Sequence, residues 1–477
     1  MPESLKQKTI KGLTWNAVNN FITRGISFLL GILLARLLSP GDYGLIAMIS
    51  VFIAILSVFI DSGMTNALIR KQDRSEADLA TVFYFNLAVS CLIYVVMFVS
   101  APFIADFYRM PQLVLLTRIL TIGIVIGAFG GIQGAVMSIN LDFKTPAKIS
   151  IVSTLLSGII GILFAFMGYG VWALVIQSLV ATTIGTLGKI YFVRWRPSEP
   201  FSKQSFKELF GFSSKLLASW LIGSIYENMY TMVIGKFFSA VQLGLYARAQ
   251  SMAQFPSSNA TGVLQSVTYP VLAKMQDDND RLAHNYRRML RLSAYIIFPM
   301  MIGLSSVSAS FIHFVLTDKW VEAVPYLQII CFAFMWYPIH AINLNLLQVK
   351  GRSDLFLRLE IIKRIMGVIM LCVTIPLGLM AMCYGCVLMS VISLVINTYY
   401  TGKLIHVGFI KQMGDLMPVF IDCILMGGVC YLVQLPFINS GIRLFIAVVT
   451  GVVYYIGSSY VRHSSEMQEV LSLIKRK

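Results

Sequence analysis

Long apolar stretches separated by short polar loops follow one another along the whole chain. Each holds about 20 or more mainly apolar residues, the length a helix needs to cross a hydrocarbon core of roughly 30 Å. The approximate limits are 13–37, 43–68, 80–104, 113–138, 147–168, 170–193, 209–236, 242–272, 293–316, 323–348, 357–377, 379–402, 415–434 and 442–461. The pattern predicts an all-α polytopic membrane protein of about fourteen transmembrane helices.

A short sequence at the start of the second stretch returns 200 residues later, where the eighth stretch starts. Residues 38–47 read LSPGDYGLIA and residues 238–247 read FSAVQLGLYA, so Ser, Gly, Leu and Ala coincide. Repeats of whole bundles of spans are typical of secondary transporters, which bind substrate at the repeat interface. The offset covers an even number of spans, so both copies cross the membrane in the same direction. We therefore expect two six-helix lobes in parallel pseudo-repeat, plus two extra C-terminal helices.

The longest polar loops fit this division of the chain. Residues 194–208 contain Pro197 and Pro200 and are expected to link the lobes. The tail has apolar residues at helical spacing and ends in three cations, which favours an amphipathic helix on anionic lipid. The expected parts are an N-terminal lobe at 1–193 (helices 1–6), a cytoplasmic linker at 194–208, a C-terminal lobe at 209–402 (helices 7–12), extra helices 13–14 at 403–461, and a cytoplasmic amphipathic tail at 462–477.

Composition agrees with the span pattern, since 57% of residues are hydrophobic and only 13% are charged. The net charge of +16 does not indicate nucleic acid, because the cations lie on one side. If the amino terminus is cytoplasmic, the inner loops collect nearly all the loop Lys and Arg, whereas the outer loops hold almost only Arg109 and Lys319. The positive-inside rule then places both termini in the cytoplasm. The first span follows a polar segment without a cleavage site, so we expect it to be retained.

Ionisable residues inside spans mark candidate sites, because a charge at the bilayer centre costs a few kcal/mol even on lenient scales. Such residues normally face a cavity or a partner. The candidates are Arg24 in the first span, Asp61 in the second, Lys215 and Glu227 in the seventh, Arg248 in the eighth, and Lys363 and Arg364 in the eleventh. Asn343 adds a polar position to the tenth span.

Arg24 and Arg248 come from opposite predicted lobes, and arginine recognises phosphate through paired charge-assisted hydrogen bonds. Glu227, with Tyr226 and Tyr230, supplies acceptors and aromatic faces suited to a sugar. A structural alternative remains open, in which Arg24 pairs with Asp61, and Glu227 with Arg248, to hold the lobes together. Lys215, Lys363 and Arg364 are also explained by snorkelling to the inner surface.

The sequence holds no catalytic constellation and no nucleotide-binding loop, so we expect a transporter without a cofactor. The Cys383-x-x-Cys386 spacing has no second ligand pair and is not taken as a metal site. Transport then draws on a gradient, with H⁺ or Na⁺ as a possible coupling ion, on the membrane potential, or on the supply of substrate.

Several segments together resemble Wzx-type polysaccharide and O-unit flippases, and their colanic-acid-exporter branch in particular. The similarity covers roughly residues 5–410. It rests on residues 8–15 (KTIKGLTW), 35–40 (ARLLSP), 61–63 (DSG), 67–71 (ALIRK), 234–237 (IGKF), 245–249 (LYARA) and 269–278 (YPVLAKMQDD). These exporters belong to the multidrug/oligosaccharidyl-lipid/polysaccharide (MOP) superfamily.

The resemblance implies a two-lobed flippase of the bacterial inner membrane that moves an undecaprenyl-pyrophosphate-linked oligosaccharide outward by alternating access. In related lipid II flippases, arginines on the first and eighth helices bind pyrophosphate, and Arg24 and Arg248 occupy similar places. Glu227 departs from the Asn or Asp expected in the seventh span. Implied partners are membrane lipids and a polysaccharide polymerase complex. A cation-coupled drug antiporter, and a polytopic polymerase or ligase, are the alternatives; the short outer loops disfavour the latter.

Overall fold

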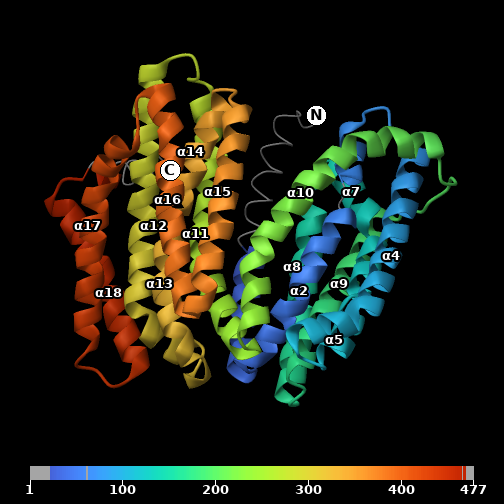
Figure 1. The fold of residues 1–477 in the computed structure, drawn as a ribbon, viewed down its shortest axis with the longest axis horizontal. Helices are drawn as coiled ribbons and strands as arrows, with labels where there is room; N and C mark the ends of the chain where they lie inside the picture. Colours follow the sequence, from blue (N-terminus) through green and yellow to red (C-terminus); the bar gives the residue numbers. More distant parts are fainter. Residues whose placement is uncertain (1–21, 61–62, 465, 469–477) are drawn as a thin grey trace, which may run out of the picture. The chain divides into compact units, whose positions relative to one another are not determined.

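The computed structural model describes residues 22–60, 63–464 and 466–468, and all their regular elements are helices (Figure 1). The chain divides into two compact units. Unit 1 comprises Met1–Gly244 and unit 2 comprises Leu245–Lys477. The predicted all-α class is confirmed.

Unit 1 starts, within the described residues, with a helix over 22–37. The helices that follow are α2 (Pro40–Ile60), α3 (Met64–Arg70), α4 (Glu76–Tyr108), α5 (Leu113–Leu120), α6 (Ile122–Ala128), α7 (Gly131–Ile139), α8 (Lys144–Phe166), α9 (Val171–Val193), α10 (Lys203–Phe237) and the first turn of α11 (Ala240–Ala273).

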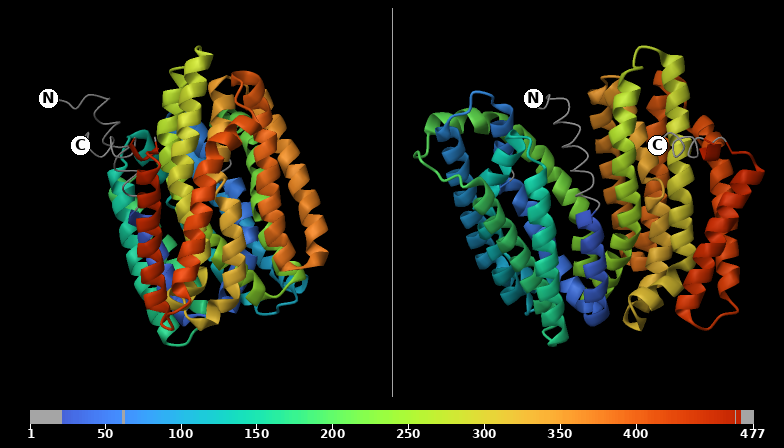
Figure 2. Two further views of the ribbon diagram at one scale, coloured as in Figure 1. Left: turned by 90° about the vertical axis from the view of Figure 1, so that its left-hand side faces the viewer. Right: turned by 180° about the vertical axis from the view of Figure 1, so that it is seen from behind.

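Unit 2 contains the remainder of α11 and the helices that follow it. These are α12 (Asn279–Val315), η1 (Asp318–Ala323), α13 (Val324–Phe334), α14 (Tyr337–Val349), α15 (Ser353–Thr374), η2 (Ile375–Leu377), α16 (Leu379–Ile405), α17 (Phe409–Gln434) and α18 (Ser440–Val461). Within this unit α17 and α18 form a hairpin that packs on α12, drawn in red beside yellow in Figure 2.

Within the described residues, every predicted span coincides with a helix or with helices in direct succession; residues 13–21 of the first span and 61–62 of the second lie outside that part of the chain. Among the described residues, nine helices are long and apolar enough to cross a membrane, or ten if the bent pair Leu113–Ala128 and Gly131–Ile139 is one span. The helical pattern is compatible with fourteen spans, and that number stays a prediction.

The repeated sequence forms the same local structure twice. Before α2, the Ser39 amide donates to Asp42 Oδ2 at 2.9 Å and the Asp42 amide donates to Ser39 Oγ at 3.3 Å. Before α11, the Ser239 amide donates to Gln242 Oε1 at 3.2 Å and the Gln242 amide donates to Ser239 Oγ at 3.1 Å. Each is a capping box, which satisfies otherwise unpaired amides at a helix start. The aligned segments 38–47 and 238–247 therefore form equivalent hydrogen bonds at the starts of α2 and α11.

Helix α10 packs along α2, α3 and α4 in unit 1 (Figure 1). In its last turn, Lys236 Nζ donates to the Phe107 carbonyl at 2.6 Å and lies 4.3 Å from the centroid of the Phe107 ring. A cation is favourable there because the carbonyls ending α4 carry partial negative charge. Contacts thus divide the chain after Gly244, whereas the predicted second lobe starts at residue 209. The predicted lobe limits stay a prediction.

Candidate functional site

The predicted site residues occur in both units. Unit 1 holds Arg24 on the 22–37 helix and, on α10, Tyr226, Glu227 and Tyr230. Unit 2 holds Arg248 on α11, Asn343 on α14, and Lys363 with Arg364 on α15. Asp61 lies outside the described residues, as does the side chain of Lys215.

Three of the helices that carry charged candidates, α10, α11 and α15, are less apolar than the candidate membrane spans. Helices α10, α11 and α15 are long enough to span a membrane, but none is among the nine apolar candidates found in the described part of the chain. Their polar side chains lower the mean hydropathy without breaking the helix. Polar helices in a membrane protein face a water-filled cavity or other protein rather than lipid. The candidates on α10, α11 and α15 therefore lie on helices of lower hydropathy, whereas Asn343 lies in the apolar candidate Asp318–Val349.

Two tyrosines and a carboxylate gather on α10. Tyr226 and Tyr230 are half-buried and one helical turn apart, so they share a face. Glu227 is exposed and adjoins that face. Arg24 is likewise exposed. Aromatic faces beside an accessible carboxylate can stack against a sugar ring and accept hydrogen bonds from its hydroxyls.

The cations of unit 2 differ in their surroundings. Arg248 is half-buried one turn beyond Gly244 on α11. Lys363 forms an ion pair with Glu360 on the preceding turn of α15, and both side chains are largely shielded from solvent. That pairing neutralises Lys363 locally. Arg364, the adjoining cation, is half-buried.

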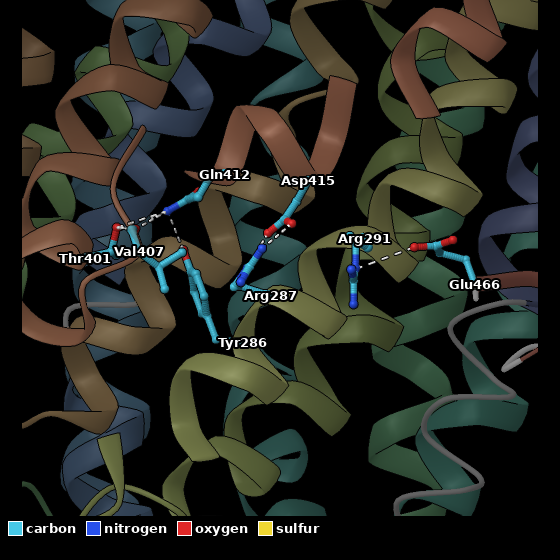
Figure 3. A network of polar contacts seen from close by, with 8 residues as sticks. All are labelled: Tyr286, Arg287, Arg291, Thr401, Val407, Gln412, Asp415 and Glu466. Carbon is cyan, nitrogen blue, oxygen red and sulfur yellow. Dashed lines mark hydrogen bonds and ion pairs between the residues drawn. The ribbon is translucent and has the colours of Figure 1, made fainter. Parts of the chain in front are cut away.

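Asn343 lies at the centre of a buried hydrogen-bond network in unit 2. Its Oδ1 accepts from the Tyr286 hydroxyl at 2.8 Å, and its Nδ2 donates to Gln412 Oε1 at 3.1 Å. Gln412 Nε2 is 3.0 Å from both Thr401 Oγ1 and the Val407 carbonyl (Figure 3). Tyr286, Asn343 and Gln412 are each 0% exposed. These contacts join α12, α14, α16 and α17, so the Asn343 side chain is engaged in contacts between helices.

Two ion pairs continue this network towards the tail, as Figure 3 shows. Arg287 binds Asp415 through two hydrogen bonds of 2.6 and 2.7 Å, a bidentate pairing between α12 and α17. One turn later, Arg291 Nε is 3.5 Å from Glu466 Oε1. The described part of the tail is thereby joined to α12.

The cytoplasmic linker predicted at 194–208 is docked rather than extended away from unit 1. Lys71 Nζ lies 3.0 Å from Asp78 Oδ2 and 3.0 Å from Glu208 Oε2. These hydrogen bonds, to Asp78 first and then to Glu208, raise the pKa of the Lys71 ammonium above its ordinary value. Trp195 Nε1 donates to Glu76 Oε2 at 3.0 Å. The start of α10, which carries Tyr226 and Glu227 further on, is therefore anchored to α3 and α4.

Sequence reasoning missed Lys189, a half-buried cation on α9. A Cβ atom added to Gly130 would lie 3.3 Å from Lys189 Cδ, so the glycines near this bend leave room for the lysine stem. Here Leu113–Ala128 and Gly131–Ile139 are bent by 41°. The sequence does indicate Lys189 as a candidate, because it is a charged residue inside the apolar stretch 170–193. The glycines thus accommodate a charged side chain as well as close helix packing.

The fold and the apolar helices define a multi-pass α-helical membrane protein. The chain matches the family model described as "Polysaccharide biosynthesis protein" over residues 33–325, and it belongs to that family.

Curated relatives agree with this assignment. TuaB of Bacillus subtilis (strain 168), a teichuronic acid biosynthesis protein, is 28% identical over 463 residues, which cover 96% of each chain. WzxC of Escherichia coli (strain K12), a lipopolysaccharide biosynthesis protein, is 27% identical over 76% of this chain and 74% of its own. ExoT of Rhizobium meliloti (strain 1021), a succinoglycan biosynthesis transport protein, is 25% identical over 69% of this chain and 67% of its own.

Solved structures share the fold. The lipid II flippase MurJ in an inward closed conformation superposes with a TM-score of 0.75 and 15% identity, covering 94% of this chain and 98% of MurJ. An inward-facing multidrug resistance MATE family transporter of the MOP superfamily superposes with a TM-score of 0.61 and 14% identity, covering 80% of this chain and 95% of that one. The chain therefore shares the fold of these two transport proteins.

Proposed function

We propose that this protein is a flippase that carries a lipid-linked oligosaccharide across the bacterial inner membrane for polysaccharide assembly. The observation that carries the proposal is membership of the polysaccharide biosynthesis family in a multi-pass membrane protein. Relatives over most of the chain are named for polysaccharide biosynthesis or transport. The similarity of the fold to that of the flippase MurJ supports the same proposed function.

The proposed substrate is an oligosaccharide joined through pyrophosphate to undecaprenol. Arg24 and Arg248 are the proposed pyrophosphate ligands, because their guanidinium groups offer paired donors to phosphate oxygens. Tyr226, Glu227 and Tyr230 are the proposed sugar contacts. Asn343 leaves the proposed ligand set because its amide is engaged in the buried network. Lys363, paired with Glu360, and Arg364 are secondary candidates.

Both termini are proposed to face the cytoplasm, which rests on the one-sided distribution of loop Lys and Arg. Transport is proposed to proceed by alternating access, with H⁺ or Na⁺ as the coupling ion. The protein acts by moving its substrate rather than by altering a bond. A polysaccharide polymerase is the proposed recipient of the product.

Translocation in reconstituted vesicles tests the function. Purified protein is placed in liposomes that carry a fluorescent undecaprenyl-pyrophosphate oligosaccharide, and inward-oriented and outward-oriented lipid are distinguished with a membrane-impermeant quencher. The proposal expects exchange between leaflets only in vesicles that contain the protein. An imposed pH or Na⁺ gradient that changes the extent of exchange identifies the coupling ion. Absence of exchange in vesicles whose protein is verified as folded would refute the flippase role.

The alternative of a cation-coupled drug antiporter has a distinct outcome. Such a protein would export cationic dyes from the same vesicles under an imposed gradient and would leave the lipid-linked sugar in place. A control with labelled undecaprenyl phosphate lacking the sugar shows whether the oligosaccharide is recognised.

A further inference from the structure

A histidine lies inside one of the apolar membrane spans of unit 2. His340 is on α14, within the candidate span Asp318–Val349. The imidazole ring is half-buried, whereas Asn397, which contacts it from α16, is 1% exposed. The ring therefore borders the packed core and keeps one side open. An ionisable residue inside a membrane span is costly and typically marks a pathway for ions or protons.

The hydrogen bonds around the ring define a neutral imidazole. Asn397 Nδ2 lies 3.3 Å from His340 Nδ1. An amide nitrogen only donates, so Nδ1 accepts and the ring proton is on Nε2. Nε2 lies 3.1 Å from Ser390 Oγ, which itself donates to the Ala333 carbonyl at 3.0 Å. The donors therefore follow one direction, from Asn397 through the ring and Ser390 to the last turn of α13.

One acceptor beside the neutral ring is not used. In the described part of the chain, Asn397 Oδ1 is buried and no donor reaches it. Rotation of the amide by half a turn exchanges Oδ1 with Nδ2, and the oxygen then faces His340 Nδ1. A neutral ring protonated on Nδ1 would need the Ser390 hydroxyl proton, which the Ala333 carbonyl already accepts. Only the imidazolium can donate to Oδ1 and to Ser390 together.

The charges that act on the ring come from α15. Helices α12, α15 and α16 pack on α14. Lys363 on α15 acts on His340 through its charge, and Glu360 pairs with Lys363. Tyr286 on α12 and Cys386 on α16 carry a phenol and a thiol, which are uncharged near neutral pH. Separation of the ion pair would therefore change how firmly the ring holds a proton, and α15 also carries the secondary candidates for substrate contact.

We propose that His340 is the proton-binding site that couples transport to a proton gradient. The proposal rests on the proposed flippase function and selects H⁺ over Na⁺ as the coupling ion. The present arrangement is the proton-released state. On protonation, the Nδ1 lone pair takes a proton from water, Asn397 Oδ1 accepts the new N–H, and Ser390 continues to accept from Nε2. Return to the neutral ring releases the same proton to water, so each cycle carries one proton and needs no other reactant.

NMR of the histidine rings tests proton binding without any transport. Full-length protein with ¹⁵N-labelled histidine is placed in lipid nanodiscs, and the His340 signal is identified by its absence from the His340→Gln variant. We expect a ring protonated on Nε2 alone at high pH and on both nitrogens after acidification, with the change between about pH 5 and pH 8, where imidazoles usually titrate. A His340 ring that stays neutral down to about pH 5 would overturn the proposal.

Two variants of Asn397 distinguish a proton site from a histidine that only packs. Asn397→Asp places a carboxylate beside Nδ1 and is expected to move the titration of His340 to higher pH by about one unit or more. Asn397→Leu removes the acceptor and is expected to move the titration to lower pH. A purely structural histidine predicts a lower thermal stability in both variants and no opposite shifts. Titration of His340 at the same pH in both variants would contradict the proposed role of Asn397 Oδ1.

The vesicle assay then tests the coupling. His340→Gln cannot bind a proton at this position, so we expect it to keep exchange of the lipid-linked sugar between leaflets and to lose the response to an imposed pH gradient. His284→Gln, at an exposed position of α12, is the matched control and should keep that response. A response to a Na⁺ gradient alone, or an unchanged pH response in His340→Gln, would overturn the coupling role. Absence of exchange in every variant would refute the flippase role instead, and the NMR titration would still decide whether His340 binds a proton.

Discussion

Gly44 and Gly244 make reciprocal close contacts within unit 1. A Cβ atom added to Gly44 would lie 1.8 Å from the Ala240 carbonyl oxygen, and one added to Gly244 would lie 1.8 Å from the Pro40 carbonyl oxygen. The first turns of α2 and α11 therefore cross with backbone against backbone, and each contributes the equivalent residue of the repeat. Such an approach permits Cα–H···O contacts that any side chain would prevent. The equivalence supports the duplication predicted from the sequence.

Replacement of either glycine by alanine is expected to destabilise this crossing. A methyl group in a site without space costs about 1–3 kcal/mol, so Gly44→Ala and Gly244→Ala should each lower the midpoint of thermal unfolding. Gly41→Ala is the matched control, because its Cβ would be 3.6 Å from Val241 Cγ2, an ordinary contact. If all three variants melt alike, the close approach does not limit stability.

The two arginines are expected to act as ligands rather than as structural groups. Arg24→Ala and Arg248→Ala should each abolish polysaccharide export at normal membrane levels, as quantified by export assays and immunoblots. Arg→Lys should restore export only in part, since an ammonium supplies charge without the planar pair of donors.

A structural ion pair would behave differently from a ligand. It predicts that the loss of export follows the loss of protein, and that the double change Arg24→Gln with Asp61→Asn restores both. Restoration by that double variant would make Arg24 a structural residue. The pyrophosphate proposal would then depend on Arg248 alone.

Asn343 is expected to affect folding and not substrate recognition. Asn343→Ala removes the acceptor of the Tyr286 hydroxyl and the donor to Gln412 Oε1, at a cost of about 1–3 kcal/mol for an unsatisfied buried group. Thermal stability should fall, and export per protein molecule should stay unchanged. Asn140→Ala, at an exposed position, is the control and should have little effect. Normal stability with lost export would return Asn343 to the ligand set.

The topology can be tested by cysteine labelling in a variant without the exposed Cys91 and Cys372. Glu199→Cys should react with an impermeant maleimide only from the cytoplasm, and Asp318→Cys, at a position whose side chain is 88% exposed, only from outside. The expectation follows from the positive-inside distribution of loop cations. Reaction of both from one side would contradict the assigned number of spans between them.

The sequence predicted the helices well because a transmembrane helix is specified locally. Apolar runs of sufficient length, such as 147–168 and 170–193, coincide with α8 and α9, since backbone groups in lipid must be satisfied within the segment itself. The capping residues Ser39 and Ser239 were likewise visible as part of the repeat. Polar residues in apolar runs indicated candidate sites by the same local argument, although Lys189 was overlooked.

Only the tertiary structure decided which polar residues are neighbours. Asn343 was an intramembrane polar residue by sequence, yet its partners Tyr286 and Gln412 come from helices far along the chain. The contacts of α10 with α2, α3 and α4 equally depend on packing, as do those of Lys71 with Asp78 and Glu208. The hydropathy of a residue indicates only whether it prefers water or lipid. Whether a polar group meets a partner or a ligand depends on helices brought together from distant parts of the chain, and packing alone determines that.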